Sequence, residues 1–461
     1  MIIFGLYDLD YKIKNIYKHK RKVGLCMSFF TNSIPVPMRK NTAGRESVRM
    51  SNANVVTLPM QMHTGEPAIP VVKMGDLVKV GTLIAKASGE NSSPIYASVS
   101  GKVTKITDYV NESGETVPAI VITSDGEMAT EEFQPPVLNS REDLLAAVLE
   151  SGVVGLGGAG HPAHLKLDVD FSKLEVLIIN GAECEPFVTS DDHVMNERGA
   201  DIEFALKAYQ KHFGIKRIII GVGDNKADAF EKMQEMASHM LGVEVVTFPS
   251  DYAQGTEEAI IYHTLGEVLS ADKSPIDLGC LVINVSTVAA IGNYLKTGMP
   301  FVERYVTVDG QCVKNAKCVI APIGVSVSEL VEFCGGFEGE PEKIVVGGPM
   351  MGTSVPSVDA PVVKTTSAVL ALSETQAYSP KATPCIRCGR CTNNCPLGLA
   401  PASIEKAHAK KDVELLEQLM VNACIGCGIC AYVCPAHRPL VQTNKLAKAL
   451  LNEEKAKEAN K

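Results

Sequence analysis

The sequence has neither a long apolar run nor an excess of basic residues. No stretch approaches the roughly 18 to 20 consecutive apolar residues that a membrane-spanning helix needs, so we expect any membrane association to be peripheral. The formal net charge is −9, from 44 Lys and Arg against 53 Asp and Glu. Because recognition of nucleic-acid phosphates needs a basic field, this balance argues against nucleic-acid binding.

A disulfide framework and a secretory signal are also missing. Eight of the 14 cysteines fall in two C-terminal runs, and the other six show no pairing pattern, which predicts a reducing, cytosolic compartment. Those six are Cys26, Cys184, Cys280, Cys312, Cys318 and Cys334. A basic cluster at 18–22 follows an apolar start, whereas in a signal peptide it would precede the apolar region. We interpret residues 1–40 as an N-terminal tail, with Met27 an equally plausible start.

The chemistry that is present centres on the two cysteine runs. Each reads C-x2-C-x2-C-x3-C-P, at 385–396 and 424–435, the pattern with which two-cluster bacterial ferredoxins hold two [4Fe–4S] clusters. In that pattern the fourth cysteine of each run ligates the other cluster. The predicted ligand sets are Cys385, Cys388, Cys391 and Cys434 for one cluster, and Cys424, Cys427, Cys430 and Cys395 for the other. Zinc or disulfides are less favoured, because isolated C-x2-C pairs would leave the third and fourth cysteines of each run unexplained.

The 461 residues suggest about three to four compact units. Within 68–107, apolar residues alternate between glycine turns, which predicts a small all-β unit. It resembles the barrel-sandwich hybrid of biotinyl and lipoyl domains, but the turn at 90–93 has no Lys to modify. We therefore expect a structural or docking module.

Farther along the chain, strand-like segments alternate with helical ones, which predicts an α/β domain with a mainly parallel sheet. A small β-grasp unit and a mainly helical cluster domain follow it. The predicted domains are a barrel-sandwich hybrid at 41–134, the α/β domain at 135–303, the β-grasp domain at 304–352, a linker at 353–380 and the cluster domain at 381–461.

Polar and glycine residues gather after the predicted strands, where parallel sheets bind their ligands. A loop with Gly155, Gly157, Gly158 and Gly160 precedes a helix carrying Lys166, an arrangement that suits a phosphate. By itself this loop is equally compatible with a structural turn. Further candidates follow three other strand ends: Asn180, Glu183 and Glu185; Tyr252, Gly255 and Glu257; and Asn284 and Thr287.

Together these residues carry a resemblance to the RnfC/RsxC family, whose members are subunits of the Rnf ferredoxin:NAD oxidoreductase. The central region of that family is related to the flavin-bearing, NADH-binding subunit of respiratory complex I. The match runs from about Lys40 to Pro435 and covers the four parts in the same order. That order is more specific than any single motif.

The resemblance implies a role for each candidate residue. Gly155, Gly157, Gly158, Gly160 and Lys166 would cradle the phosphate of FMN. Asn180 and Glu183 would lie along the flavin, and Asn284 and Thr287 would complete its site. Glu185 and Glu257 would approach NADH, in a pocket shaped by Tyr252 and Gly255. No acid or base is expected, because hydride transfer moves no separate proton.

The implied protein is a peripheral subunit on the cytoplasmic face of a membrane-bound, ion-translocating ferredoxin:NAD oxidoreductase. It would exchange hydride between NADH and FMN and relay single electrons through two [4Fe–4S] clusters. Its partners would be other subunits of the complex and ferredoxin or a ferredoxin-like subunit. Two alternatives stay open: an RnfC-like electron-transfer subunit of a soluble NADH-dependent reductase, and an iron–sulfur scaffold that binds no nucleotide. The second stays open because His161 stands where the family usually has Phe.

Overall fold

The computed structural model describes residues 33–459 apart from 52, 112–113 and 270–272. These residues form two compact units. The large unit comprises Pro37–Ser250 and Pro275–Tyr378, and the cysteine unit comprises 33–36, Asp251–Ser274 and the chain from Ser379 onward. Most of the predicted tail and Met27 lie outside the described residues. Among those residues, no helix combines the length and apolar character required to cross a membrane.

A four-stranded parallel sheet lies at the centre of the large unit, in the order β11 (Val243–Phe248), β10 (Ile218–Gly223), β9 (Val176–Gly181) and β12 (Cys280–Asn284). The prediction of a mainly parallel sheet is confirmed. Strands β9 and β10 are rich in buried Ile and Leu, as expected for strands covered on both faces. The neighbouring helices are α2 (Arg141–Glu150), α3 (Ala163–Leu167), α4 (Ser190–Glu197), α5 (Gly199–Phe213), α6 (Ala227–Ser238) and α8 (Val285–Thr297).

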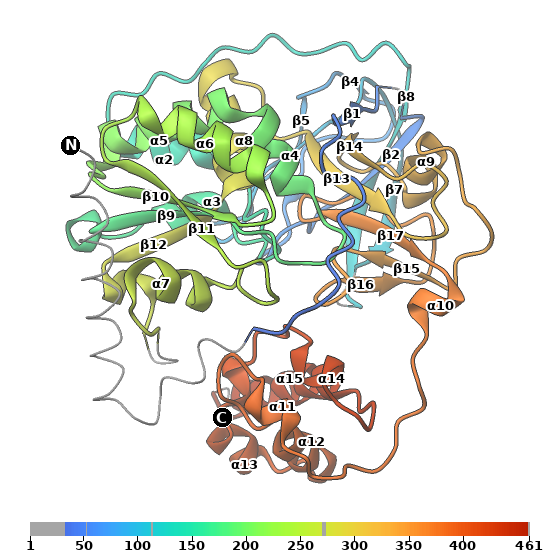
Figure 1. Ribbon diagram of the computed structural model, residues 1–461. Helices are drawn as coiled ribbons and strands as arrows, with labels where there is room; N and C mark the ends of the chain where they lie inside the picture. The colour runs from blue at the N-terminus through green and yellow to red at the C-terminus, as the bar shows by residue number, and fades with distance from the viewer. Residues whose placement is uncertain (1–32, 52, 112–113, 270–272, 460–461) are drawn as a thin grey trace. The chain divides into compact units, whose positions relative to one another are not determined.

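Helices α5, α6 and α8 cover one face of this sheet (Figure 1). Helices α5 and α8 pack closely, since a Cβ atom on Gly292 would lie 1.9 Å from the carbonyl oxygen of Asp201. In the sheet, Asn180 of β9 is the register partner of Asn284 of β12. The pairing places the polar carboxyl ends of two strands side by side, next to the start of α8.

The N-terminal part of the large unit is the predicted small all-β unit. One antiparallel sheet has the order β2 (Val55–Pro59), β8 (Thr116–Ser124), β7 (Gly101–Val110) and β4 (Leu77–Val78). A second has the order β3 (Ile69–Pro70), β5 (Leu83–Lys86) and β6 (Ile95–Tyr96). Their apolar faces share a core with the sheet that follows.

That third sheet corrects the predicted linker at 353–380. Its order is β1 (Val48–Arg49), β14 (Lys317–Pro322), β13 (Glu303–Asp309), β17 (Ala368–Leu372), β15 (Lys343–Val346) and β16 (Thr353–Val355). Two of these strands, β16 and β17, lie in the supposed linker. All five residues of β17 are apolar and buried, which explains why the segment forms an inner strand between β13 and β15. Helices α9 (Val327–Phe333) and α10 (Glu374–Ala377) complete this part.

The cysteine unit is mainly helical, as predicted. It contains α7 (Glu257–Leu265), α11 (Arg390–Asn393), α12 (Pro401–Lys410), α13 (Val413–Gln418), α14 (Ile429–Tyr432) and α15 (Leu440–Ala459). Its core includes the fully buried Ile404 and Leu416. The segment Asp251–Ser274, predicted in the α/β domain, belongs to this unit instead. It follows β11, an edge strand, so the chain can leave the sheet there without breaking strand pairs.

Candidate functional site

Each cysteine run folds in the same way. The third cysteine of each run, Cys391 or Cys430, lies in a one-turn helix, α11 or α14. The residue before each helix is a glycine in the left-handed conformation, Gly389 with φ 75° and Gly428 with φ 81°. A side chain at either position would be strained, so glycine permits the tight turn between the second and third cysteines.

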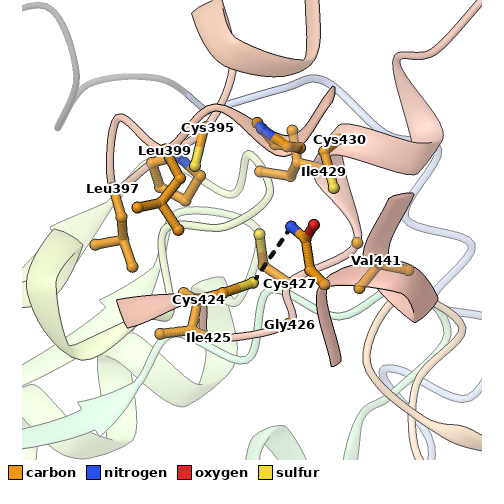
Figure 2. Close-up of a pocket in the computed structure, with 14 residues that line it drawn as sticks. Cys395, Leu397, Leu399, Cys424, Ile425, Gly426, Cys427, Ile429, Cys430 and Val441 are labelled. Carbon is orange, nitrogen blue, oxygen red and sulfur yellow. Dashed lines mark hydrogen bonds between the residues drawn. The ribbon is translucent and has the colours of Figure 1, made fainter. Parts of the chain in front are cut away.

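One pocket gathers four cysteines from both runs. Cys395 of the first run and Cys424, Cys427 and Cys430 of the second line it, and Figure 2 shows their side chains arranged around it. Burial raises the pKa of the Cys427 and Cys430 thiols to about 12. Metal binding here would therefore have to displace protons from neutral thiols.

A second pocket gathers the remaining four. Cys385, Cys388 and Cys391 of the first run line it together with Cys434 of the second. Cys385 and Cys388 are exposed, and the cations Arg387, Lys406 and Arg438 share the lining. Arg438 also makes a bidentate contact with Glu405, with Nε 2.9 Å from both carboxylate oxygens. The eight cysteines are thus grouped four and four, and their role as cluster ligands stays a prediction.

The all-cysteine lining of both pockets suits iron–sulfur clusters, which thiolates hold in fours. Among the described residues, no three His, Cys, Asp or Glu side chains form a group able to hold a single metal ion.

In the large unit, the glycine loop is fixed to the start of α8. Leu156 N–H donates to Thr287 Oγ1 at 2.9 Å. A Cβ atom on Gly157 would lie 3.2 Å from Cβ of Asn284, whereas one on Gly158, where φ is 102°, would have no neighbour within 4 Å. The structure therefore brings the loop at 155–160 together with Asn284 and Thr287. It leaves an open backbone surface at Gly158.

A buried carboxylate that the sequence did not reveal lies beside these residues. Asp191 accepts hydrogen bonds from Asn284 Nδ2 at 2.8 Å and from the Ser286 hydroxyl. Its own N–H donates to Glu183 Oε1 at 2.6 Å. Burial raises the pKa of Asp191. These bonds connect Glu183, Asp191 and Asn284 into one polar network at the carboxyl ends of β9 and β12.

Two buried lysines hold the loop that follows β9. The Lys40 ammonium donates to the carbonyl oxygens of Glu183 at 3.0 Å and Glu185 at 2.9 Å, and also to that of Val188. Lys226 Nζ donates to the carbonyl oxygen of Ala182 at 2.9 Å. Neither lysine was among the predicted site residues, because Lys40 ended the supposed tail and Lys226 followed an apparent structural turn.

Burial perturbs the acids of the same loop. It raises the pKa of the Glu183 carboxyl to about 7, although nearby Lys40 acts in the opposite direction, and it lowers the pKa of Lys40 to about 8. Glu183 also has a positive φ of 43°, uncommon outside glycine. Asn180 supports the turn by accepting a hydrogen bond from the N–H of Ala182 at 3.1 Å.

Glu185 contacts the glycine-rich loop after β15. Its carboxylate accepts hydrogen bonds from the N–H groups of Met350 at 3.1 Å and Met351 at 2.8 Å. A Cβ atom on Gly348 would lie 2.3 Å from Glu185 Oε2, so only glycine fits beneath this carboxylate. Burial raises the pKa of Glu185 to about 7.

Tyr252, Gly255 and Glu257 lie in the cysteine unit. The Tyr252 hydroxyl donates to the backbone oxygen of Cys427 at 2.6 Å, and Thr256 caps α7 by accepting from the N–H of Ala259 at 3.4 Å. These three predicted residues are therefore gathered with one cysteine pocket. They do not form a single described site with the residues of the large unit.

Four family descriptions match successive parts of the chain. They are the RnfC barrel sandwich hybrid domain at 29–127, the Nuo51 FMN-binding domain at 148–293, the SLBB domain at 305–354 and the 4Fe-4S dicluster domain at 378–454. This order confirms the predicted fold class. It defines a modular electron-transport oxidoreductase with an FMN-binding domain and an iron–sulfur domain.

Curated relatives identify the family. The chain is 36% identical over 382 residues to the RnfC-type subunit of the Na(+)-translocating ferredoxin:NAD(+) oxidoreductase complex of Acetobacterium woodii, a match that covers 81% of this chain and 86% of that protein. It is 37% identical over 395 residues to the corresponding subunit of the proton-translocating complex of Clostridium ljungdahlii, covering 83% and 86%. The chain belongs to the RnfC family of ion-translocating oxidoreductase subunits.

Among solved structures, the chain is similar to a chain of an NAD+-reducing [NiFe]-hydrogenase in the air-oxidized state. The sequence identity is 18% and the TM-score is 0.49, with 69% of this chain and 64% of the other covered.

Proposed function

We propose that the chain is a peripheral, cytoplasmic-side subunit of a membrane-bound complex that exchanges electrons between NADH and ferredoxin. The observation that carries this proposal is the grouping of eight cysteines into two sets of four, in a chain that also has an FMN-binding domain. The names of the A. woodii and C. ljungdahlii relatives support the two substrates. Other subunits of the complex are the expected partners.

The cysteines would hold two [4Fe–4S] clusters. Cys395, Cys424, Cys427 and Cys430 would bind one, and Cys385, Cys388, Cys391 and Cys434 the other. Each cluster carries one electron at a time, so the pair can deliver electrons singly to a partner.

In the large unit, Gly155, Gly157, Gly158 and Gly160 with Lys166 would hold the FMN phosphate. The open backbone at Gly158 supports this role, since it leaves space for a bound group. Asn180, Glu183, Asn284 and Thr287 would line the flavin. When bound, FMN can accept two electrons as hydride and release them one at a time.

NADH would be oriented by Glu185 and Glu257, with Tyr252 and Gly255 shaping its pocket. These carboxylates would position the cofactor by hydrogen bonding and would transfer no proton. In the structure, backbone N–H groups already engage the carboxylate of Glu185, so NADH would have to share or replace these partners.

Anaerobic titration with NADH tests the function. Chain reconstituted with FMN, iron and sulfide should accept about four electrons, two on the flavin and one on each cluster, where the potentials allow. Bleaching of the flavin and EPR signals of reduced clusters should therefore develop together, up to about two equivalents of NADH. A flavin that remains oxidised in excess NADH would exclude the dehydrogenase role. Clusters that dithionite still reduces would then favour the nucleotide-free scaffold.

A further inference from the structure

The two cysteine pockets differ in the surroundings of their sulfur atoms. Apart from its four cysteines, the pocket of Cys395, Cys424, Cys427 and Cys430 is lined by glycine, proline and aliphatic side chains, with one polar exception, Asn444. The pocket of Cys385, Cys388, Cys391 and Cys434 has three cations and two exposed cysteines. One pocket is therefore apolar and buried, and the other is charged and open to solvent.

Asn444 lies on α15 and is 1% exposed. Its Nδ2 donates to Cys424 Sγ across 3.7 Å, the bond drawn as a dashed line in Figure 2. One helical turn farther on, Lys448 Nζ donates to the backbone oxygen of Cys424 at 3.4 Å. Helix α15 thus contacts both the sulfur and the backbone of this one cysteine.

The orientation of the Asn444 amide has a chemical reason. Its Oδ1 is buried without a hydrogen-bond partner, an unfavourable condition for a polar atom. Turning the amide over would place this oxygen against sulfur, and a thiolate is itself an acceptor. Only the observed orientation offers a donor to Cys424. The unpartnered oxygen shows that the polar side chain is not retained for its contacts with the surrounding protein.

We propose that Asn444 is a positioning residue that raises the reduction potential of the cluster bound by Cys395, Cys424, Cys427 and Cys430. The inference rests on the proposed function, because it needs a cluster in this pocket. Reduction adds one negative charge, which spreads over the iron and its sulfur ligands. An N–H donor stabilises the reduced cluster more than the oxidised one, and hydrogen bonds to sulfur are among the determinants of such potentials. Solvent and neighbouring cations would act on the other cluster instead.

The consequence is that the chain holds two clusters of unequal potential, one of them adjusted by a single amide. No proton moves in this step, because Asn444 keeps both hydrogens while the cluster gains or loses one electron. Asn444→Leu removes the donor in a side chain of similar size. Asn444→Gln keeps an amide on a longer side chain.

The test is a redox titration of the full, reconstituted chain followed by EPR. In Asn444→Leu, one of the two clusters should titrate at a more negative potential and the other should be unchanged. Asn444→Gln should restore part of the shift. The matched control is Thr392→Val, which removes a hydroxyl from the lining of the other pocket and should leave the Asn444-dependent cluster at its wild-type potential.

Unchanged potentials for both clusters in Asn444→Leu would overturn the inference. If that variant assembles only one cluster, Asn444→Ser and Asn444→Gln decide: a more negative potential in Ser than in Gln supports the inference, and identical potentials refute it. Iron content of about eight atoms per chain and flavin reduction by NADH are measured on the same samples. These readouts report on the proposed function independently, so its failure is distinguishable from a failure of the role of Asn444.

Discussion

Gly157 lies so close to Asn284 that one added methyl group changes the contact. A Cβ atom at Gly157 would be 3.2 Å from the Asn284 side chain, which also caps α8 and donates to Asp191. Gly157→Ala should therefore displace Asn284 and weaken FMN binding, by about 1 to 3 kcal/mol if one buried hydrogen bond is lost. Flavin retained per chain after gel filtration measures the effect.

Gly155→Ala is the matched control for this variant. Its Cβ would meet only ordinary contacts at 3.6 Å, and its φ is not positive. The variant should retain FMN at nearly the wild-type level, and both variants should retain their clusters. Equal flavin loss in the two variants would contradict a specific role for the contact between Gly157 and Asn284.

Glu185 should make stability depend on pH. Burial raises the pKa of its carboxyl to about 7 from 4.5, so the folded chain binds the proton more tightly than the unfolded chain. This contribution to stability is fully present below about pH 4.5 and is lost as the pH rises through about 7. Glu185→Gln removes the titration and should flatten the fall in unfolding temperature between pH 5 and 8, measured by calorimetry. In the control Glu132→Gln, at an exposed residue, the wild-type slope should remain.

Residues that recur in a local pattern could be predicted from the sequence, whereas those that depend on distant contacts could not. The cysteine spacing alone predicted the two groups of four that the pockets gather. Lys40 contacts backbone more than 140 positions away, at Glu183 and Glu185. Asp191 and Asn444 likewise have no neighbouring motif to mark them. Long-range burial gives such residues their chemistry, and a single sequence does not record it.

At the scale of elements, periodicity predicted the parallel strands but not where the chain changes units. Strands β9, β10, β11 and β12 formed where apolar runs and following helices indicated them. Strand β17 was missed because a short apolar run of five residues after glycine and proline segments can also belong to a linker. The segment Asp251–Ser274 was misassigned because its helical pattern continues the β-α alternation, although its contacts lie elsewhere.

The hydrogen bond from Tyr252 to Cys427 connects this segment to a cysteine pocket. Tyr252 is 1% exposed, and its hydroxyl lies 2.6 Å from the backbone oxygen of Cys427. Tyr252→Phe should leave that oxygen without its donor and destabilise the turn by about 1 to 3 kcal/mol. Faster hydrogen exchange in α14 and faster loss of iron to a chelator would measure it. Tyr432→Phe, at a residue 53% exposed, is the control and should change neither rate.

At the scale of the whole molecule, one buried lysine connects three parts of the large unit. Lys364, next to the third sheet, is 1% exposed and donates to Ser93 Oγ at 3.1 Å and the carbonyl oxygen of Pro94 at 2.6 Å. Both acceptors belong to the barrel-sandwich part. It also donates to the carbonyl oxygen of Gly152 at 2.7 Å, which belongs to the α/β part. The family descriptions separate these parts, but this side chain makes their folding interdependent.

Lys364→Met tests that interdependence. The substitution keeps an unbranched apolar side chain but leaves the Pro94 and Gly152 carbonyls without this donor, at about 1 to 3 kcal/mol each. We expect the free energy of unfolding of the large unit to fall by about 2 to 6 kcal/mol, measured by urea denaturation followed by circular dichroism. Lys105→Met, at an exposed position on β7, should have little effect. If the parts folded independently, Lys364→Met would also leave the transition unchanged. If they are interdependent, hydrogen exchange should accelerate together in the barrel-sandwich strands, in α2 and in the third sheet, because removing one shared donor loosens all three.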